Sequence, residues 1–237
     1  MSKLLDRIAD TSGLVFLLFV GVGYAAFVAP FSPPSLGSPQ HVVQFLETHP
    51  VDWRFGVGLT MEFVGLLALL IFAARLAGRV RGFDRPDGWA PAAIVSLAAL
   101  SAAVKVASFG PGLVGRQHHQ RYAPETVTAM FDLNEAAYDL SWALDGAFLL
   151  LLGAAALALG GMPRWLACWA LVAGAAIEVG IAVPALFDNL QLVFLLWLVA
   201  ASIWAMHTPN RTATTAERSA TPWNTWPSSA ARTSRGR

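Results

Sequence analysis

Six stretches of this chain are each apolar and long enough to cross a lipid bilayer: residues 13–30, 55–77, 89–110, 131–159, 163–185 and 188–207. A spanning helix needs roughly 20 predominantly apolar residues. In hydrocarbon the backbone must also satisfy its own hydrogen bonds, which a helix does within one segment. The sequence therefore predicts an all-α fold, a polytopic membrane bundle of six transmembrane helices.

Composition agrees that lipid is the main solvent of this chain. Hydrophobic residues make up 56% and charged residues 13%, with a mean hydropathy of +0.54, whereas roughly 25% of the residues in a soluble domain are charged. After residue 207 the sequence changes to Thr, Ser, Ala, Arg and Pro, a composition that cannot bury a core. We therefore expect a six-helix transmembrane domain over 1–207 and a disordered cytoplasmic tail over 208–237.

The distribution of Lys and Arg predicts the orientation, because cytoplasmic segments of membrane proteins are enriched in these residues. With the N-terminus inside, the outer loops contain three of them: Arg54, Arg116 and Arg121. Twelve then fall in cytoplasmic segments: Lys3, Arg7, Arg75, Arg79, Arg81, Arg85, Arg164, Arg211, Arg218, Arg232, Arg235 and Arg237. This asymmetry predicts a multi-pass plasma-membrane protein with cytoplasmic N- and C-termini and with the loops near 31–52 and 111–130 outside.

The sequence argues against several classes of function. A net charge of +1 gives no basis for nucleic-acid binding. Cys168 is the one cysteine, so the chain forms neither an intramolecular disulfide nor a CxxC zinc site. No histidine lies in the middle of a span to ligate haem, and no nucleophile with its base and no phosphate loop is recognisable. We expect no cofactor and no catalytic residue, and we favour a function other than catalysis.

Five ionisable side chains fall inside the predicted spans: Glu62, Lys105, Asp139, Asp145 and Glu178. Each costs roughly 2.5–3.5 kcal/mol on insertion scales, so each needs a structural or functional reason. The helical rise of ~1.5 Å per residue places all but Asp145 at a similar depth, about 8–14 Å below the outer surface. Asp145 is about 9 Å deeper than Asp139 by the same rise.

Three of these charges share a helix face with small residues, which mark the places where transmembrane helices approach closely. We therefore expect the three to point into the bundle and, at their common depth, to meet Asp139 in one cluster. The faces are those of Glu62 with Gly58 and Gly65, Lys105 with Ser101 and Ser108, and Glu178 with Gly174, Ala175 and Ala182.

An acidic stripe runs inward from the outer end of the fourth predicted helix. Asp132, Glu135 and Asp139 lie within an arc of about 60°, counting 100° per residue. Asp145 is rotated about 120° from Asp139 on the same helix. We therefore expect Asp145 to face a different neighbour.

Two interpretations of these charges remain open. In the structural interpretation, Lys105 pairs with one or two carboxylates and holds the bundle together, while the outermost acids are solvated. In the functional interpretation, one lysine leaves about two carboxylates uncompensated, and such a site takes up protons, binds a cation or holds water. The functional interpretation predicts an outward-facing intramembrane acidic binding site made by Glu62, Lys105, Asp139, Glu178, Asp132, Glu135 and Asp145.

His118 and His119 lie in the second outer loop, above the acidic stripe. Together with Asp132 or Glu135 they would supply nitrogen and oxygen ligands of the kinds that bind zinc. Two adjacent histidines in a basic loop are more often solvated. They are weak candidates for a metal site, and the sequence assigns no particular metal.

The turn Met162-Pro163-Arg164-Trp165-Leu166 and the acidic, aromatic segment from Phe131-Asp132-Leu133-Asn134 to Tyr138-Asp139 resemble a broad family of bacterial six-helix membrane proteins. That family is known only as a domain of unknown function. The resemblance covers residues 10–207, and Ala167 stands where the family usually has glycine. It implies the six-helix architecture and adds no mechanism.

Three classes of function follow from the sequence. The first is a small transporter-like or solute- or cation-binding protein that uses the outward-facing acidic site. The alternative is a structural or regulatory subunit of a membrane complex, and a membrane enzyme is third, since it would need a histidine of the second loop to fold back over the acidic stripe. The partners we expect are the lipid bilayer, a cation or small polar solute, and a membrane protein or a second copy of this chain.

Overall fold

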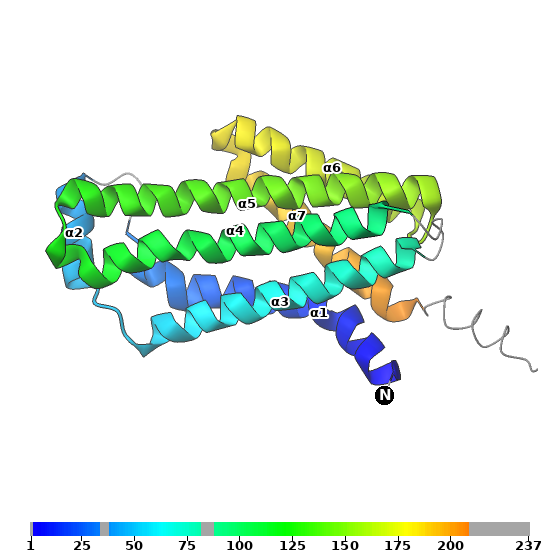
Figure 1. Cartoon of the computed structure of the whole chain (residues 1–237), viewed down its shortest axis with the longest axis horizontal. Helices are drawn as coiled ribbons and strands as arrows, with labels where there is room; N and C mark the ends of the chain where they lie inside the picture. Colours follow the sequence, from blue (N-terminus) through cyan, green and yellow to red (C-terminus); the bar gives the residue numbers. More distant parts are fainter. Residues whose placement is uncertain (1, 34–37, 82–87, 209–237) are drawn as a thin grey trace, which may run out of the picture.

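The computed structural model describes residues 2–33, 38–81 and 88–208, and every regular element in these ranges is helical (Figure 1). Six long helices are apolar enough to cross a membrane, so the predicted all-α, six-span fold is confirmed. The predicted tail lies outside the described residues, apart from Thr208. The α-helices are α1 (Ser2–Val22), α2 (Pro39–Thr48), α3 (Trp53–Arg81), α4 (Ala90–His118), α5 (Pro124–Leu159), α6 (Arg164–Ala182) and α7 (Pro184–His207).

The six long helices form a closed ring in chain order. Each packs against the next, from α1 to α3, α4, α5, α6 and α7, and α7 packs against α1. The start of α1 and the end of α7 lie at one end of the bundle, and α2 lies at the other (Figure 1). We call these the terminal end and the α2 end. The prediction that both termini share one side of the membrane requires this arrangement, and which side is cytoplasmic stays a prediction of the charge distribution.

The first span is irregular near the α2 end. After Val22 it continues as a π-helical segment, Gly23–Val28, and then as a 3₁₀ turn, Ala29–Phe31. π-Helical turns are rare inside helices and occur often at functional sites. Here the segment packs against α3, and it changes the direction of the side chains that follow it.

The short helix α2 lies within a segment that the sequence analysis treated only as an outer loop. The hydroxyl of Ser38 accepts a hydrogen bond from the backbone N–H of His41 at 3.3 Å, and Pro39 occupies the first turn. Both features are typical of helix starts. Val42 and Leu46, four residues apart, bury their side chains against Val127 of α5. This packing fixes α2 across the end of the bundle.

Helix α4 does not end at residue 110, where the predicted third span ends, but continues through Pro111 to His118. Two glycines after Pro111 let α5 approach α4 closely. A Cβ on Gly112 would lie 2.8 Å from Asn134 Oδ1, and one on Gly115 would lie 3.3 Å from the Phe131 ring. These two glycines therefore serve close helix packing, and α4 ends at His118, within the predicted outer loop 111–130.

Helix α5 has 36 residues, which corresponds to about 54 Å at ~1.5 Å per residue. The hydrocarbon core of a bilayer is about 30 Å thick. The first turns of α5, which begin seven residues before the predicted span, therefore project toward water at the α2 end. These turns carry the exposed side chains of Asp132 and Glu135.

Candidate functional site: charged groups inside the bundle

Lys105 and Asp145 form a buried ion pair between α4 and α5. Lys105 is 4% exposed and Asp145 is 1% exposed. The Lys105 ammonium donates a hydrogen bond to Asp145 Oδ2, and the Ser101 hydroxyl donates to Asp145 Oδ1 at 2.6 Å. Lys105 Nζ also lies 4.7 Å from the centre of the Trp142 ring. Both oxygens of Asp145 and the charge of Lys105 are thus compensated within the α4–α5 interface.

This partner differs from the predicted one, because Asp145 was expected to face away from the cluster around Lys105. The face of α5 that meets α4 contains Asn134, Ser141 and Asp145, spaced seven and four residues apart. Asp139 is rotated about 120° from Asp145. The long side chain of Lys105 also covers part of the difference in depth between Lys105 and Asp145. The direction in which Asp145 leaves α5 therefore determined the ion pair with Lys105 more than its depth in the membrane did.

Glu62 lies in a different interface, between α3 and the first span. Its side chain is 5% exposed, and its Oε1 has no hydrogen-bond partner within the described part of the chain. A Cβ on Gly23, the first residue of the π-helical segment, would lie 3.6 Å from Glu62 Cγ. The carboxyl group is therefore enclosed beside the irregular part of the first span.

The glycines around Glu62 confirm that this face of α3 points into the bundle. A Cβ on Gly58 would lie 2.7 Å from Phe27 Cβ, and one on Gly65 would lie 2.7 Å from Val20 Cγ2. The first span thus approaches α3 on both sides of Glu62. The predicted small-residue face of Glu62 is confirmed.

Two aromatic side chains of α5 lie beside the Lys105–Asp145 pair. The rings of Tyr138 and Trp142 meet edge to face with centroids 6.3 Å apart. Trp142 also contacts the Lys105 ammonium. The two rings therefore pack beside the buried ion pair.

The remaining acids lie elsewhere. Glu178 of α6 is half-buried, and its Oε1 lies 2.7 Å from the position that a Cβ on Gly146 of α5 would occupy. Asp139 is half-buried, whereas Asp132 and Glu135 are exposed. The described contacts thus place four of the seven predicted residues in three interfaces: Glu62 between α3 and the first span, Lys105 and Asp145 between α4 and α5, and Glu178 between α5 and α6.

The two histidines proposed as weak metal ligands end α4 and begin the following 3₁₀ turn, His119–Arg121. His119 Nδ1 lies 3.0 Å from the carbonyl oxygen of Arg116, and His119 Nε2 is buried without a hydrogen-bond partner in the described ranges. No group of three metal-ligating side chains that could hold an ion occurs among the described residues. The described residues therefore provide no set of ligands for a metal ion at these histidines.

A cluster at the terminal end was not predicted; we call the group of Asp6, Asp10, Arg75 and Arg79 the terminal clasp. Arg75 donates to Asp6 Oδ1 at 2.7 Å and to Asp10 Oδ1 at 2.8 Å. Arg79 donates to Asp10 Oδ1 at 3.1 Å and to the carbonyl oxygen of Ala205 at 2.8 Å. The clasp therefore joins α1, α3 and the last turns of α7.

The turn between α5 and α6 packs onto the same region. Gly160 and Gly161 have φ angles of 98° and 92°, a conformation that favours glycine. A Cβ on Gly161 would lie 2.7 Å from the carbonyl oxygen of Arg79. This tight turn thus packs over the clasp.

A family model described as Domain of unknown function (DUF4386) matches residues 11–208. The chain belongs to this family. The match covers the six spans together with the terminal clasp residues Arg75 and Arg79, and it confirms the resemblance to a domain of unknown function over 10–207. No curated protein and no solved structure matches the chain, so the family assignment supports the membrane architecture and leaves the activity to be argued from the residues.

Proposed function

We propose that this six-span membrane protein binds a proton or a small cation at Glu62, as part of a transporter-like or solute-binding function. The observation that carries the proposal is the enclosed Glu62 carboxyl group, whose Oε1 has no hydrogen-bond partner in the described ranges. An ionised carboxylate is too costly to bury uncompensated, so it takes up a proton or coordinates a cation. Either event changes the charge inside the bundle.

The surroundings of Glu62 support a binding role over a purely structural one. The Lys105 ammonium is engaged by Asp145 and Ser101, so its described contacts compensate another carboxylate. The α1–α3 interface at Glu62 is also the place where the first span is π-helical. We expect this segment to change its packing when the charge of its neighbour changes, because π-helical turns often occur at functional sites.

We propose that an ion reaches Glu62 from the α2 end, which we place outside the cell from the distribution of Lys and Arg. On this side lie the acidic first turns of α5, with Asp132 and Glu135 exposed. These acids would raise the local concentration of cations near the entrance. At the opposite end the terminal clasp ties α1, α3 and α7 together, so we do not expect ions to enter there.

Carbodiimide labelling tests the proposal directly, because dicyclohexylcarbodiimide partitions into membranes and reacts with protonated carboxyl groups. Purified full-length protein in nanodiscs is treated across mildly acidic to mildly alkaline pH, and the adduct is located by mass spectrometry. We expect an adduct on Glu62 that decreases as the pH rises and that Na⁺, K⁺ or Li⁺ reduces. Glu178→Gln, which changes a half-buried acid in another interface, is the matched control and should leave this adduct unchanged.

Thermal unfolding supplies the second measurement. A ligand that binds only the folded state stabilises it in proportion to the logarithm of its concentration. The wild type should therefore be stabilised by an ion or small solute in a pH-dependent manner, and Glu62→Gln should remove that effect while Asp132→Asn retains it. A wild type that shows neither a Glu62 adduct nor any ion- or solute-dependent shift would leave the structural-subunit alternative in its place.

A further inference from the structure

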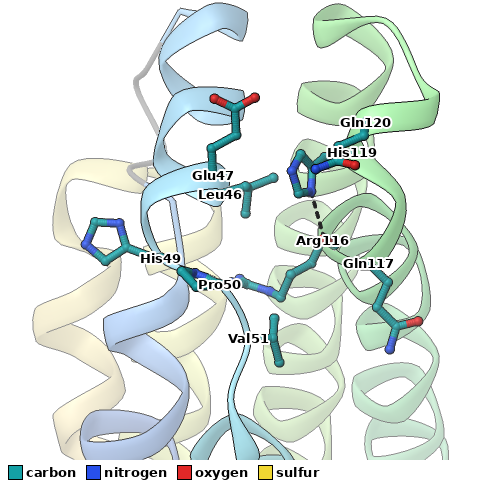
Figure 2. A pocket seen from close by; sticks show the side chains of 9 residues that line it. All are labelled: Leu46, Glu47, His49, Pro50, Val51, Arg116, Gln117, His119 and Gln120. Carbon is teal, nitrogen blue, oxygen red and sulfur yellow. Dashed lines mark hydrogen bonds between the residues drawn. The ribbon is translucent and has the colours of Figure 1, made fainter.

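A pocket of about 390 Å³ opens at the α2 end, between the end of α2, the segment that follows it and the end of α4 (Figure 2). Pockets that bind small molecules usually have volumes of roughly 300–1,000 Å³. The floor is formed by Leu46, Arg116 and His119, and the exposed rim includes Glu47, His49 and Val51. This pocket lies at the end of the bundle and is separate from Glu62.

The floor of the pocket contains a buried cation that has no carboxylate partner among the described residues. Arg116 is 6% exposed, and none of the ion pairs in the described part of the chain includes it. Its guanidinium carbon lies 4.7 Å from the centre of the Phe55 ring and 5.5 Å from that of Phe131, and NH1 donates to the carbonyl oxygen of Phe31. The aromatic rings hold the side chain in place without neutralising it.

The second polar group of the floor is an acceptor. His119 Nδ1 faces a carbonyl oxygen, which only accepts hydrogen bonds, so Nδ1 carries the hydrogen. In the neutral ring Nε2 is then an acceptor, and it is buried with no partner in the residues described. In Figure 2 the His119 ring faces Leu46, while the carboxylate of Glu47 and the ring of His49 point away from Arg116.

We propose that this pocket binds a small organic acid whose carboxylate contacts Arg116 and whose neighbouring hydroxyl group donates to His119 Nε2. A buried guanidinium prefers a carboxylate, because the charge-assisted hydrogen bonds are short and strong. The free acceptor of His119 selects a ligand with a donor beside the carboxylate. Leu46 and Val51 provide apolar walls for a short carbon chain. The ligand class is therefore a small hydroxycarboxylate, and the inference does not depend on the proposed role of Glu62.

Calorimetric titration of the purified full-length protein with lactate, propionate and ethanolamine tests the proposal. Lactate has both groups, propionate lacks the hydroxyl, and ethanolamine lacks the carboxylate. We expect lactate to bind about tenfold or more tightly than propionate, since a site built for a hydrogen bond discriminates against the analogue that lacks it, and ethanolamine not to bind. The absence of lactate binding to the wild type, or equal affinity for lactate and propionate, would overturn the assignment.

Variants locate the binding. Arg116→Gln should weaken lactate binding at least about tenfold through loss of the charged partner, while His119→Leu should remove the preference for lactate over propionate. Arg121→Gln, in the same loop but outside the pocket lining, is the control and should bind as the wild type does. Because Arg116 also holds Phe31, Val51→Trp provides a variant that fills the pocket and leaves Arg116 intact; unchanged lactate binding in Val51→Trp contradicts the proposal.

An anionic lipid headgroup also carries a negative charge and hydroxyl groups. Thermal unfolding in nanodiscs with and without phosphatidylglycerol distinguishes a lipid headgroup from a free organic acid as the ligand of the pocket. Stabilisation by lactate in nanodiscs of neutral lipid, lost in Val51→Trp, supports the small-acid site. Stabilisation that requires phosphatidylglycerol and that lactate does not reproduce would assign the pocket to lipid instead.

Discussion

The α4–α5 and α1–α3 interfaces both bury charges, but they compensate them differently. Between α4 and α5, Lys105 and Asp145 neutralise each other and Ser101 completes the hydrogen bonds. Between α1 and α3, the terminal clasp is compensated in the same way, whereas Glu62 nearer the α2 end is enclosed beside a π-helical segment. We therefore expect α4–α5 to act as a fixed wall of the bundle and the contact between α3 and the first span near Glu62 to be its adjustable part.

The largest expected effect is at the fixed wall. Lys105→Met should destabilise the protein by about 3–5 kcal/mol, because removing one partner of a buried ion pair leaves the other charge uncompensated. The double variant Lys105→Met/Asp145→Leu should recover most of this loss. The measurement is thermal or denaturant unfolding in detergent. If the double variant is as unstable as the single one, the two residues do not form the energetic unit that their geometry indicates.

The clasp should give the next largest effect. Arg79→Gln should cost about 1.5–3 kcal/mol, because it removes charged hydrogen bonds to Asp10 and to the carbonyl oxygen of Ala205. The loss should be accompanied by faster labelling of a cysteine introduced near the end of α7. Arg164→Gln, an exposed arginine at the start of α6, is the matched control and should change neither quantity. Equal behaviour of the two variants would contradict the clasp.

Packing beside Glu62 provides a third test. Gly58→Ala should destabilise by about 1–3 kcal/mol, because the added methyl group would lie 2.7 Å from Phe27 Cβ and force the first span away from α3. Gly56→Ala in the same helix has open space around the new Cβ. It should be neutral or slightly stabilising, since alanine is the better helix former. The difference between the two unfolding midpoints measures how closely the first span is held.

The smallest effect is expected at the adjustable part. Glu62→Gln should change the unfolding free energy by less than about 1 kcal/mol and not lower it, because a neutral amide replaces a carboxyl group that has few compensating contacts. The contrast with Lys105→Met is the informative quantity, and both variants are compared in the same detergent and at the same pH. A large destabilisation by Glu62→Gln would mean that Glu62 is fixed by partners and would place α1–α3 in the same class as α4–α5.

The sequence was sufficient to predict the six spans, because length and apolar composition determine which segments enter a membrane. It also predicted the inward face of Glu62, since Gly58 and Gly65 mark a close approach that needs no knowledge of the partner helix. The partner of Lys105 was not predicted correctly. That pairing depends on how α5 is rotated and shifted against α4, which a one-helix analysis does not determine.

Other elements had signals that were present but weak. The sequence contains the clasp residues as two pairs spaced four residues apart, Asp6 with Asp10 and Arg75 with Arg79. No local sequence pattern, however, shows that α1 and α3 meet there. Helix α2 begins with Ser38-Pro39 and continues with two apolar residues at helical spacing, but it is too short to stand out. The π-helical turn at Gly23–Val28 has no sequence signature apart from its glycine.

A π-helical turn is equivalent to one residue inserted into an α-helix, so the first span carries an insertion that sets the register of everything after it. Removing one residue between Gly23 and Val28 would restore the regular repeat and rotate the following residues by about 100°. The carbonyl oxygen of Phe31 would then no longer face the Arg116 side chain. In this chain the one extra residue in the π-helical turn thus determines how the end of the first span is rotated. That rotation brings the carbonyl oxygen of Phe31 to Arg116 in the pocket at the α2 end.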